Sequence, residues 1–289
     1  MKPPPFDYVA PETVDQAVGL LADADREITV LAGGQSLLPA LNMRMARPDV
    51  LVDISRVPEL GTLQVDDAGS VVLGAAVTHA AVEKDARVRH GWPLLVAAID
   101  RIGHPQIRNR GTVCGSFAHH DPAAELPAVA VALDARMLVR GPSGDREIPA
   151  ADFFTGTFDT ALDPGELLVA ARFPATRGTG WAFAELARRH GDFAVAGVAV
   201  QLVREEGMVR RAEIVCCGMG SAPVRLRSAE DALTGRPVDP AAVESAVGGA
   251  VVGLDPPTDL HAGTDYRRDA IATLLARALH DAWERSDER

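Results

Sequence analysis

Two short stretches combine glycines with side-chain hydroxyls, as phosphate-binding turns do. In the first, residues 28–37 read I-T-V-L-A-G-G-Q-S-L, a β-branched run that ends at Gly33 and Gly34 before Ser36. Glycines adopt positive φ and carry no Cβ, so a ligand can approach the main chain closely. Ser36 is expected to cap a following helix, whose N-terminus adds partial positive charge. By itself, however, this stretch fits an ordinary strand-to-helix turn better than a ligand site.

The second stretch, residues 108–125, reads R-N-R-G-T-V-C-G-S-F-A-H-H-D-P-A-A-E and has the same character. Gly111 and Gly115 supply the flexible positions, and Thr112 and Ser116 supply hydroxyls. Two such turns can close on a pyrophosphate from opposite sides. Neither contains G-x-G-x-x-G, so the pattern excludes a Rossmann dinucleotide site.

Other chemistries have less support in the sequence. Residues 119–121 (H-H-D) are ligand types, but neighbours on an extended chain point in opposite directions and no further ligand follows at helical spacing. Cys114 has no identifiable base, and no serine lies in a G-x-S-x-G motif. Asp192 is expected to satisfy main-chain amides in a turn rather than act as a general base. We therefore predict neither a catalytic residue nor a metal site in this chain.

The elements that position the first turn form a compact α/β unit ending near residue 55. Thr13 opens a helix, with Gln16 completing a capping box. A strand at 28–31, a helix at 35–46 and a strand at 49–54 follow.

The second turn lies in a longer block. It is expected to hold strands at 62–65, 71–77 and 166–173, helices at 78–86, 92–102 and 123–133, a loop at 103–122 and a hairpin of 136–140 with 146–149. Residues 174–180 (P-A-T-R-G-T-G) are the best linker in the chain.

Beyond that linker the pattern changes to an antiparallel meander followed by helices. The predicted strands are 181–186, 194–203 and 209–217, and the predicted helices are 228–233, 240–251 and 265–283. The last helix carries an apolar stripe at helical spacing, which indicates core packing. The stripe is Ile271, Leu274, Leu275, Ala278, Leu279 and Ala282.

Composition limits the function classes. The chain has 289 residues, a net charge of −11 and 47% hydrophobic residues, which fits a globular protein and argues against nucleic-acid binding. Its three cysteines have no C-x-x-C spacing, so we expect reduced thiols and no cluster ligands, with Cys216 and Cys217 half-buried in a strand. Residues 1–8 lack an apolar signal region and residues 193–203 are too short to span a bilayer, so we predict a cytoplasmic protein.

Four motifs together resemble a known family. Residues 32–37 (A-G-G-Q-S-L), 106–116 (Q-I-R-N-R-G-T-V-C-G-S), 121–125 (D-P-A-A-E) and 188–194 (R-R-H-G-D-F-A) are similar to the FAD-binding medium subunit of molybdenum hydroxylases. This is the xanthine dehydrogenase and carbon monoxide dehydrogenase type. The resemblance covers essentially the whole chain, with the motifs in the family's order and spacing.

The resemblance implies an α+β fold. Two α/β FAD-binding subdomains of the PCMH/vanillyl-alcohol-oxidase type would occupy residues 1–55 and 56–175. A C-terminal domain with a three-stranded antiparallel sheet and helices would occupy residues 176–289.

It also implies a role for individual residues. The two turns would bind the FAD pyrophosphate, Glu125 would meet ribityl or ribose hydroxyls, Asp121 would support its turn, and Asp192 with Phe193 would lie beside the isoalloxazine. The implied FAD-binding residues are Val30, Leu31, Ala32, Gly33, Gly34, Gln35, Ser36, Leu37, Ile102, Ile107, Thr112, Cys114, Gly115, Ser116, Asp121, Glu125, Leu168, Asp192 and Phe193. Two positions depart from the family: Cys114 stands where a glycine is usual, and Phe193 where tyrosine is frequent.

The function implied is that of an FAD-carrying electron-transfer subunit. A large partner would carry the molybdenum cofactor and a small partner two [2Fe-2S] clusters, the whole being a dimer of heterotrimers. Two alternatives remain open from the residues alone. One is a self-sufficient FAD oxidoreductase with Asp192 or His190 as an acid–base group, and the other is a non-enzymatic nucleotide-binding module.

Overall fold

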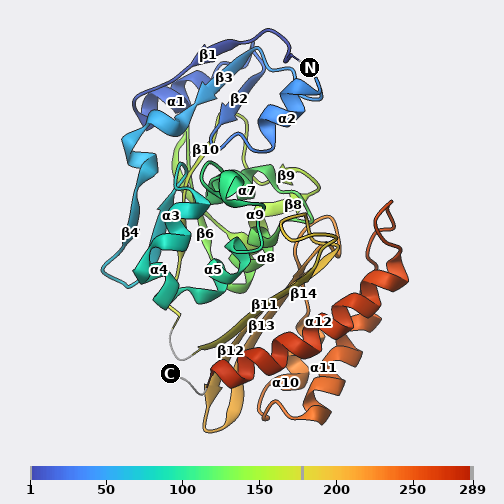
Figure 1. The fold of residues 1–289 in the computed structure, drawn as a ribbon. Helices are drawn as coiled ribbons and strands as arrows, with labels where there is room; N and C mark the ends of the chain where they lie inside the picture. Colours follow the sequence, from blue (N-terminus) through green and yellow to red (C-terminus); the bar gives the residue numbers. More distant parts are fainter. Residues whose placement is uncertain (1, 177–178, 287–289) are drawn as a thin grey trace.

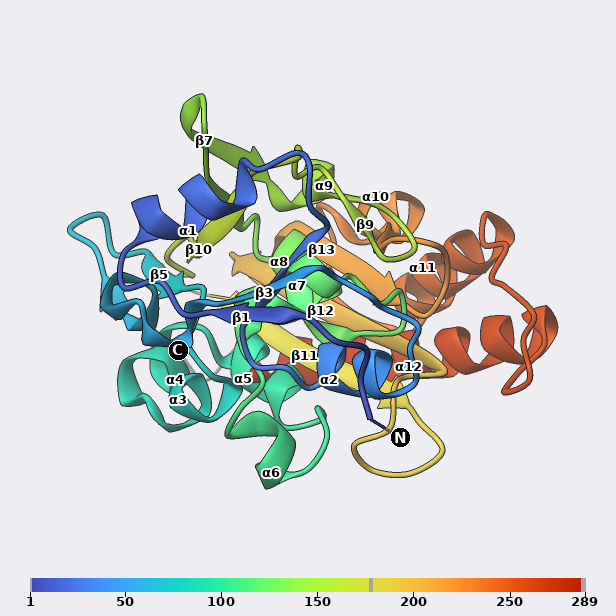
Figure 2. The same cartoon turned by 90° about the horizontal axis from the view of Figure 1, so that it is seen from above.

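The computed structural model describes residues 2–176 and 179–286 (Figure 1). Its helices and strands are mixed, which confirms the predicted α+β class. Three main sheets follow one another along the chain, with three, five and four strands. Figure 1 shows the N-terminal sheet at one end, the block with α7 and α8 in the middle, and the C-terminal sheet with its helices at the other end. Figure 2 looks along this direction from the N-terminal end.

The N-terminal sheet is parallel, in the order β1 (Asp7–Val9), β3 (Val50–Asp53), β2 (Ile28–Leu31). Helix α1 (Val14–Leu21) begins as predicted, since the Thr13 hydroxyl accepts from the Gln16 N–H at 3.2 Å. The Gln16 side chain in turn accepts from the N–H of Glu12 rather than of Thr13. Helix α2 (Leu37–Asn42) is shorter than expected at both ends.

The middle block is built on an antiparallel sheet. Its strands are β4 (Leu63–Val65), β5 (Val71–Gly74), β10 (Leu167–Phe173), β6 (Arg136–Gly141) and β7 (Gly144–Pro149), in that spatial order. Its helices include α3 (His79–Lys84), α4 (Ala86–Gly91), α5 (Pro93–Ile99) and α8 (Glu125–Ala132). Every residue of α8 is buried, so this helix lies at the centre of the molecule.

The expected loop at 103–122 was wrong in part, because it contains α6 (Pro105–Arg108) and α7 (Val113–His119). Glycine, proline and asparagine recur through this stretch, and these residue types indicate turns rather than helices. Further short elements that the periodicity did not predict are the 3₁₀ turns η1 (Ile54–Arg56) and η2 (Pro58–Gly61), α9 (Ala150–Phe153), β8 (Phe154–Gly156) and β9 (Asp159–Thr160).

The C-terminal sheet is the predicted meander, β11 (Thr179–Leu186), β12 (Ala196–Glu205) and β13 (Met208–Cys217). The short β14 (Val224–Arg225) adds a fourth strand at the edge, where three strands were expected. Of the predicted linker 174–180, residues 177–178 lie outside the described residues. Thr179 and Gly180 already belong to β11.

Both faces of this sheet are covered. Helices α5 and α8 pack on one face, while α10 (Arg227–Leu233), α11 (Pro240–Val252) and α12 (Thr264–Arg285) form the layer on the other. Consecutive residues Cys216 and Cys217 therefore face different cores, and both are fully buried instead of half-buried. The apolar stripe of α12 is buried as predicted.

Candidate functional site

The two glycine turns lie in main-chain contact. A Cβ placed on Gly33 would be 2.4 Å from the Arg110 carbonyl oxygen and 2.6 Å from the Gly111 Cα. On the next residue, Gly34 has a φ of +72°. Only glycine fits both requirements without moving backbone, and the tertiary structure thus brings together two segments far apart in the sequence.

Main-chain pairing holds the second turn in place. Thr78 and Thr112 form a β-bridge, and the His79 N–H donates to the Gly111 carbonyl at 2.9 Å. The Thr112 hydroxyl accepts from the Gly115 N–H at 3.0 Å and so caps α7. The turn is consequently rigid on the side away from Gly33.

The capping role expected for Ser36 was wrong. Ser36 occupies the N-cap position of α2 but has helical angles, φ −96° and ψ −41°, and its hydroxyl makes no capping bond. A cap requires an extended residue so that its oxygen can reach back to the free N–H groups. In this turn Gln35 supplies the local bond instead, donating from Nε2 to the Gly33 carbonyl at 2.9 Å.

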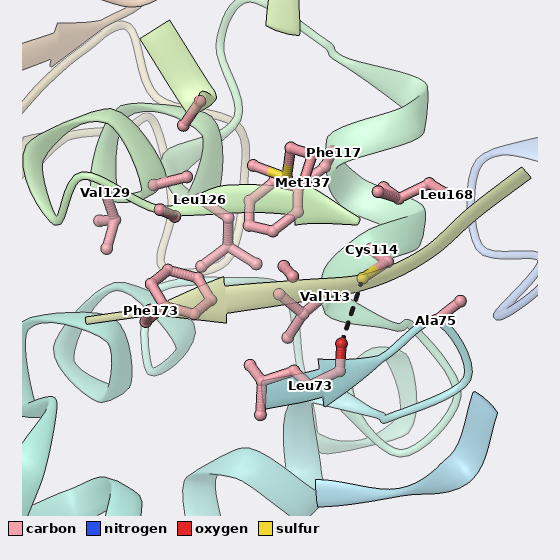
Figure 3. Close-up of a cluster of buried hydrophobic side chains, with 14 of the residues drawn as sticks. Leu73, Ala75, Val113, Cys114, Phe117, Leu126, Val129, Met137, Leu168 and Phe173 are labelled. Carbon is pink, nitrogen blue, oxygen red and sulfur yellow. Dashed lines mark hydrogen bonds between the residues drawn. The ribbon is translucent and has the colours of Figure 1, made fainter. Parts of the chain in front are cut away.

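The side chain of Cys114 points into the core, as Figure 3 shows. It is 2% exposed, and its thiol donates to the Leu73 carbonyl at 3.6 Å. Burial raises the pKa of this thiol to about 12. The cysteine side chain is therefore accommodated between α7 and β5, and Leu168 lies buried in the same cluster (Figure 3).

The strip from Val30 to Leu37 is half-buried throughout, in contrast to the buried strand β3 beside it. Ile102 and Ile107 are also half-buried. These residues are partly exposed to solvent, so a bound ligand could cover their exposed surface.

A cleft of about 790 Å³ lies where the middle block meets the C-terminal part. Asp121, Asp192 and Phe193 all line it, whereas the glycine turns are not among its lining residues. The Asp121 carboxylate accepts from the Ala123 N–H at 2.9 Å, which is the turn-supporting contact expected of it. Phe193 is 55% exposed, so its ring is free to cover a ligand.

These features fit FAD. A pyrophosphate binds main-chain amides only where no side chain blocks its approach. The Gly33–Gly111 contact leaves no side chain between the two turns. The cleft offers an exposed aromatic ring, on which a flat conjugated system can stack. Within the described ranges, no group of three or more His, Cys, Asp or Glu side chains is arranged to hold a metal ion.

Comparison with known proteins identifies the family. Residues 4–176 match the family model described as FAD binding domain in molybdopterin dehydrogenase, and residues 181–282 match the CO dehydrogenase flavoprotein C-terminal domain. The chain belongs to this family. It is an FAD-binding medium subunit of the molybdenum hydroxylase type, of the oxidoreductase class, as the motifs predicted.

Individual relatives are similar to this FAD subunit over nearly their full lengths. It is 42% identical to the 6-hydroxypseudooxynicotine dehydrogenase complex subunit alpha of Paenarthrobacter nicotinovorans, over 99% of this chain and 97% of the relative. The carbon monoxide dehydrogenase structure from Hydrogenophaga pseudoflava has a chain with a TM-score of 0.95 and 39% identity, covering 99% of each chain. Quinoline 2-oxidoreductase from Pseudomonas putida 86 matches with a TM-score of 0.94 and 34% identity, over 98% of this chain and 99% of the other.

Arg267 of the FAD subunit is a cleft residue that the sequence analysis missed. It is 3% exposed on α12, donates to the carbonyls of Val195 and Gly218, and pairs with Asp259 at 2.6 Å. Burial opposes ionisation of Asp259, but main-chain donors and Arg267 outweigh it and lower the pKa of this carboxyl. The sequence does contain a signal for this residue. Arg267 lies four residues before Ile271 and therefore falls on the apolar face of the predicted helix.

Two acids have raised pKa values, the buried Glu125 and the half-buried Glu185. Glu125, an expected FAD-binding residue, is 4% exposed, and burial raises its pKa to about 8, with the charges of Glu185 and Asp121 acting in the same direction. Glu185 on β11 was not predicted as a site residue, and no local motif marks it. Burial raises its pKa to about 7, opposed only by Arg101.

No described helix combines the length and apolar character required to cross a lipid bilayer.

Proposed function

We propose that this chain carries FAD as the electron-transfer subunit of a molybdenum-containing hydroxylase or dehydrogenase complex. Electrons from substrate oxidation at a molybdenum cofactor on a large partner would pass through two [2Fe-2S] clusters on a small partner. They would reach the FAD of this chain and leave to an external acceptor. The observation that carries the proposal is the main-chain contact between Gly33 and Gly111, which both lie in the matched FAD-binding domain of residues 4–176.

The residues of this chain would bind and orient the cofactor. Main-chain amides of the two turns would hold the pyrophosphate, and Glu125 would orient the ribityl or ribose hydroxyls. Phe193 would cover the flavin ring and exclude water from one side. FAD itself supplies the redox chemistry when bound.

The assembly proposed is heteromeric. The subunit names of relatives, among them a complex subunit alpha and medium chains, support partners for this chain. The cysteine spacing also supports partners, because the clusters need thiolate ligands that three cysteines without C-x-x-C spacing do not provide. We further propose a dimer of heterotrimers in the cytoplasm and a division into residues 1–55, 56–175 and 176–289, for which the successive sheets are the support.

The first test is the visible spectrum of the purified full chain. We expect flavin absorption bands after addition of FAD, without iron–sulfur bands. A chain that takes up no flavin would overturn the proposal and favour a module that binds another nucleotide.

The second test is copurification from the native source. We expect two further subunits that contain iron and molybdenum. A flavin-loaded chain that is isolated without partners and turns over an organic substrate would instead indicate a self-sufficient oxidoreductase.

A further inference from the structure

The side chain of Arg108 connects helix α3 with the backbone that precedes α6. Its Nε donates to Glu83 on α3 at 3.0 Å, and its Nη1 donates to the carbonyls of Ile102 at 3.1 Å and Gly103 at 3.3 Å. The side chain is 12% exposed. Figure 2 shows α6, which ends at Arg108, at the edge of the molecule below α5. A planar guanidinium carries its donors in a fixed fork, so one side chain can hold a carboxylate and main-chain carbonyls together.

The loop that leads into β12 rests on the same carbonyl of Gly103. A Cβ on Gly191 would lie 2.7 Å from the Gly103 carbonyl oxygen, and Gly191 has a φ of +88°. Ile102 and Gly191 also form a parallel β-bridge. Because no side chain separates the two segments at this contact, a shift of the backbone at 102–103 must move Gly191 as well.

Gly191 directly precedes the two residues that are expected beside the flavin ring. Gly191, Asp192 and Phe193 all line the cleft. Within the loop, the Asp192 N–H donates to the Arg189 carbonyl at 3.1 Å. The contact with Gly103 therefore fixes, from outside the loop, the point from which Phe193 reaches into the cleft.

The second glycine turn depends less on the Arg108 side chain. The Gly111 N–H donates to the Ile107 carbonyl at 2.7 Å, and the Gly111 carbonyl accepts from the His79 N–H. The β-bridge between Thr78 and Thr112 adds to these contacts. Main-chain bonds persist when a side chain is replaced, so loss of the guanidinium should affect the loop at 191–193 more than the turn.

We propose that Arg108 is a positioning residue of the FAD site, which fixes the loop at 191–193 through the backbone at 102–103. This inference rests on the proposed function, because that loop is there the part that covers the flavin ring. Arg108 does not line the cleft itself and acts through the backbone that it holds. A loop held in place before FAD binds loses less conformational freedom on binding, which strengthens the affinity for FAD.

The test is a double-mutant cycle of Arg108→Met and Phe193→Ala, with FAD affinity measured by flavin fluorescence on the full chain. We expect each single substitution to raise the FAD dissociation constant about tenfold, since one removes charged donors and the other an aromatic contact. If Arg108 acts through the loop, the double variant should bind FAD at most about twofold more weakly than the weaker single variant. Independent effects would multiply to about a hundredfold and would overturn the inference.

The visible circular dichroism of the bound flavin is a second readout, because it depends on the surroundings of the ring. At saturating FAD we expect Arg108→Met to change these bands. The control Arg146→Met removes the same kinds of contact, to Glu166 at 2.7 Å and to the Ala161 carbonyl at 2.8 Å. Arg146 lies on β7, on the opposite side of the molecule from α6 in Figure 2, so this variant should keep the wild-type bands and FAD affinity. Wild-type bands in Arg108→Met, or an equal change in Arg146→Met, would overturn the inference.

The outcomes distinguish this inference from the proposed function. Failure of the wild-type chain to bind FAD would overturn the proposed function itself, whereas multiplying effects with flavin binding intact would overturn only the role of Arg108. If Arg108→Met does not fold, Arg108→Lys carries the test, because an ammonium lacks the planar fork and cannot hold all the partners together. Altered flavin bands in Arg108→Lys would support the inference, and wild-type bands with wild-type FAD affinity would overturn it.

Discussion

At the scale of single residues, the site depends on positions where a side chain has no room. Gly33 contacts main-chain atoms of the opposite turn. If a Cβ were added to Gly33, these atoms could not move aside by a side-chain rotation. Cys114 shows the converse case. Its side chain lies among Leu73, Val113 and Leu168 in the core (Figure 3).

Gly33→Ala should separate the two turns, because its Cβ would lie 2.4 Å from the Arg110 carbonyl oxygen. We expect FAD affinity to fall by at least about tenfold and the free energy of unfolding by about 1–3 kcal/mol. Fluorescence titration and urea unfolding measure the two effects. The matched control is Gly19→Ala in α1, where a Cβ meets nothing within 4 Å. It should leave FAD affinity unchanged, and equal affinities for both variants would contradict the placement of the pyrophosphate at the two turns.

At the scale of elements, α12 packs on the C-terminal sheet and also contributes a side chain to the wall of the cleft. Its apolar face packs on the C-terminal sheet, and Arg267 on that face ties the β12 entry and the turn after β13 to the segment before α12. Arg267 thus closes one wall of the cleft from the inside.

Arg267→Met should cost about 2–4 kcal/mol in the free energy of unfolding, because the carbonyls of Val195 and Gly218 lose a buried donor. The neighbouring Arg268→Met is the control. Arg268 is partly exposed and its acidic partners Asp255 and Asp265 are solvated, so we expect a cost of about 1 kcal/mol or less. Urea unfolding followed by circular dichroism compares the two. A cost for Arg267→Met no larger than that of Arg268→Met would show that the buried network is not stabilising.

At the scale of the whole molecule, the cleft lies at a junction. Its lining comes from residues 121–123 on one side and from the C-terminal part on the other. The β-bridge between Ile102 and Gly191 crosses the same junction. A ligand bound here would contact both family domains and should stabilise them together.

FAD at about 100 times its dissociation constant should therefore stabilise the chain by about 2.7 kcal/mol and raise Tm by several degrees. Trp92 reports on the middle block, and Trp181 and Trp283 report on the C-terminal part. Calorimetry and tryptophan fluorescence should each show one unfolding transition, which FAD moves to higher temperature. The same result is expected of a Trp92→Phe variant, whose fluorescence comes from Trp181 and Trp283. A shift confined to one of two transitions would place FAD within a single domain.

Features that local patterns encode could be predicted from the amino-acid sequence. These are the motif order that identifies the family, the glycine turns, the meander of β11 to β13 and the buried stripe of α12. Each depends on residues that are close in sequence, so periodicity and turn chemistry are sufficient. The helices α6 and α7 were missed because the glycine, proline and asparagine residues around them indicate turns.

Only the tertiary structure decided which distant groups meet. It brought Gly33 against Gly111, turned Cys114 into the core, and placed Arg267 in the cleft wall. Packing also removed Glu125, and in part Glu185, from solvent, which raises the pKa of both carboxyls. The physical reason is that contact and burial arise from the packing of elements far apart in the chain, whereas the sequence motifs report only the backbone near each residue.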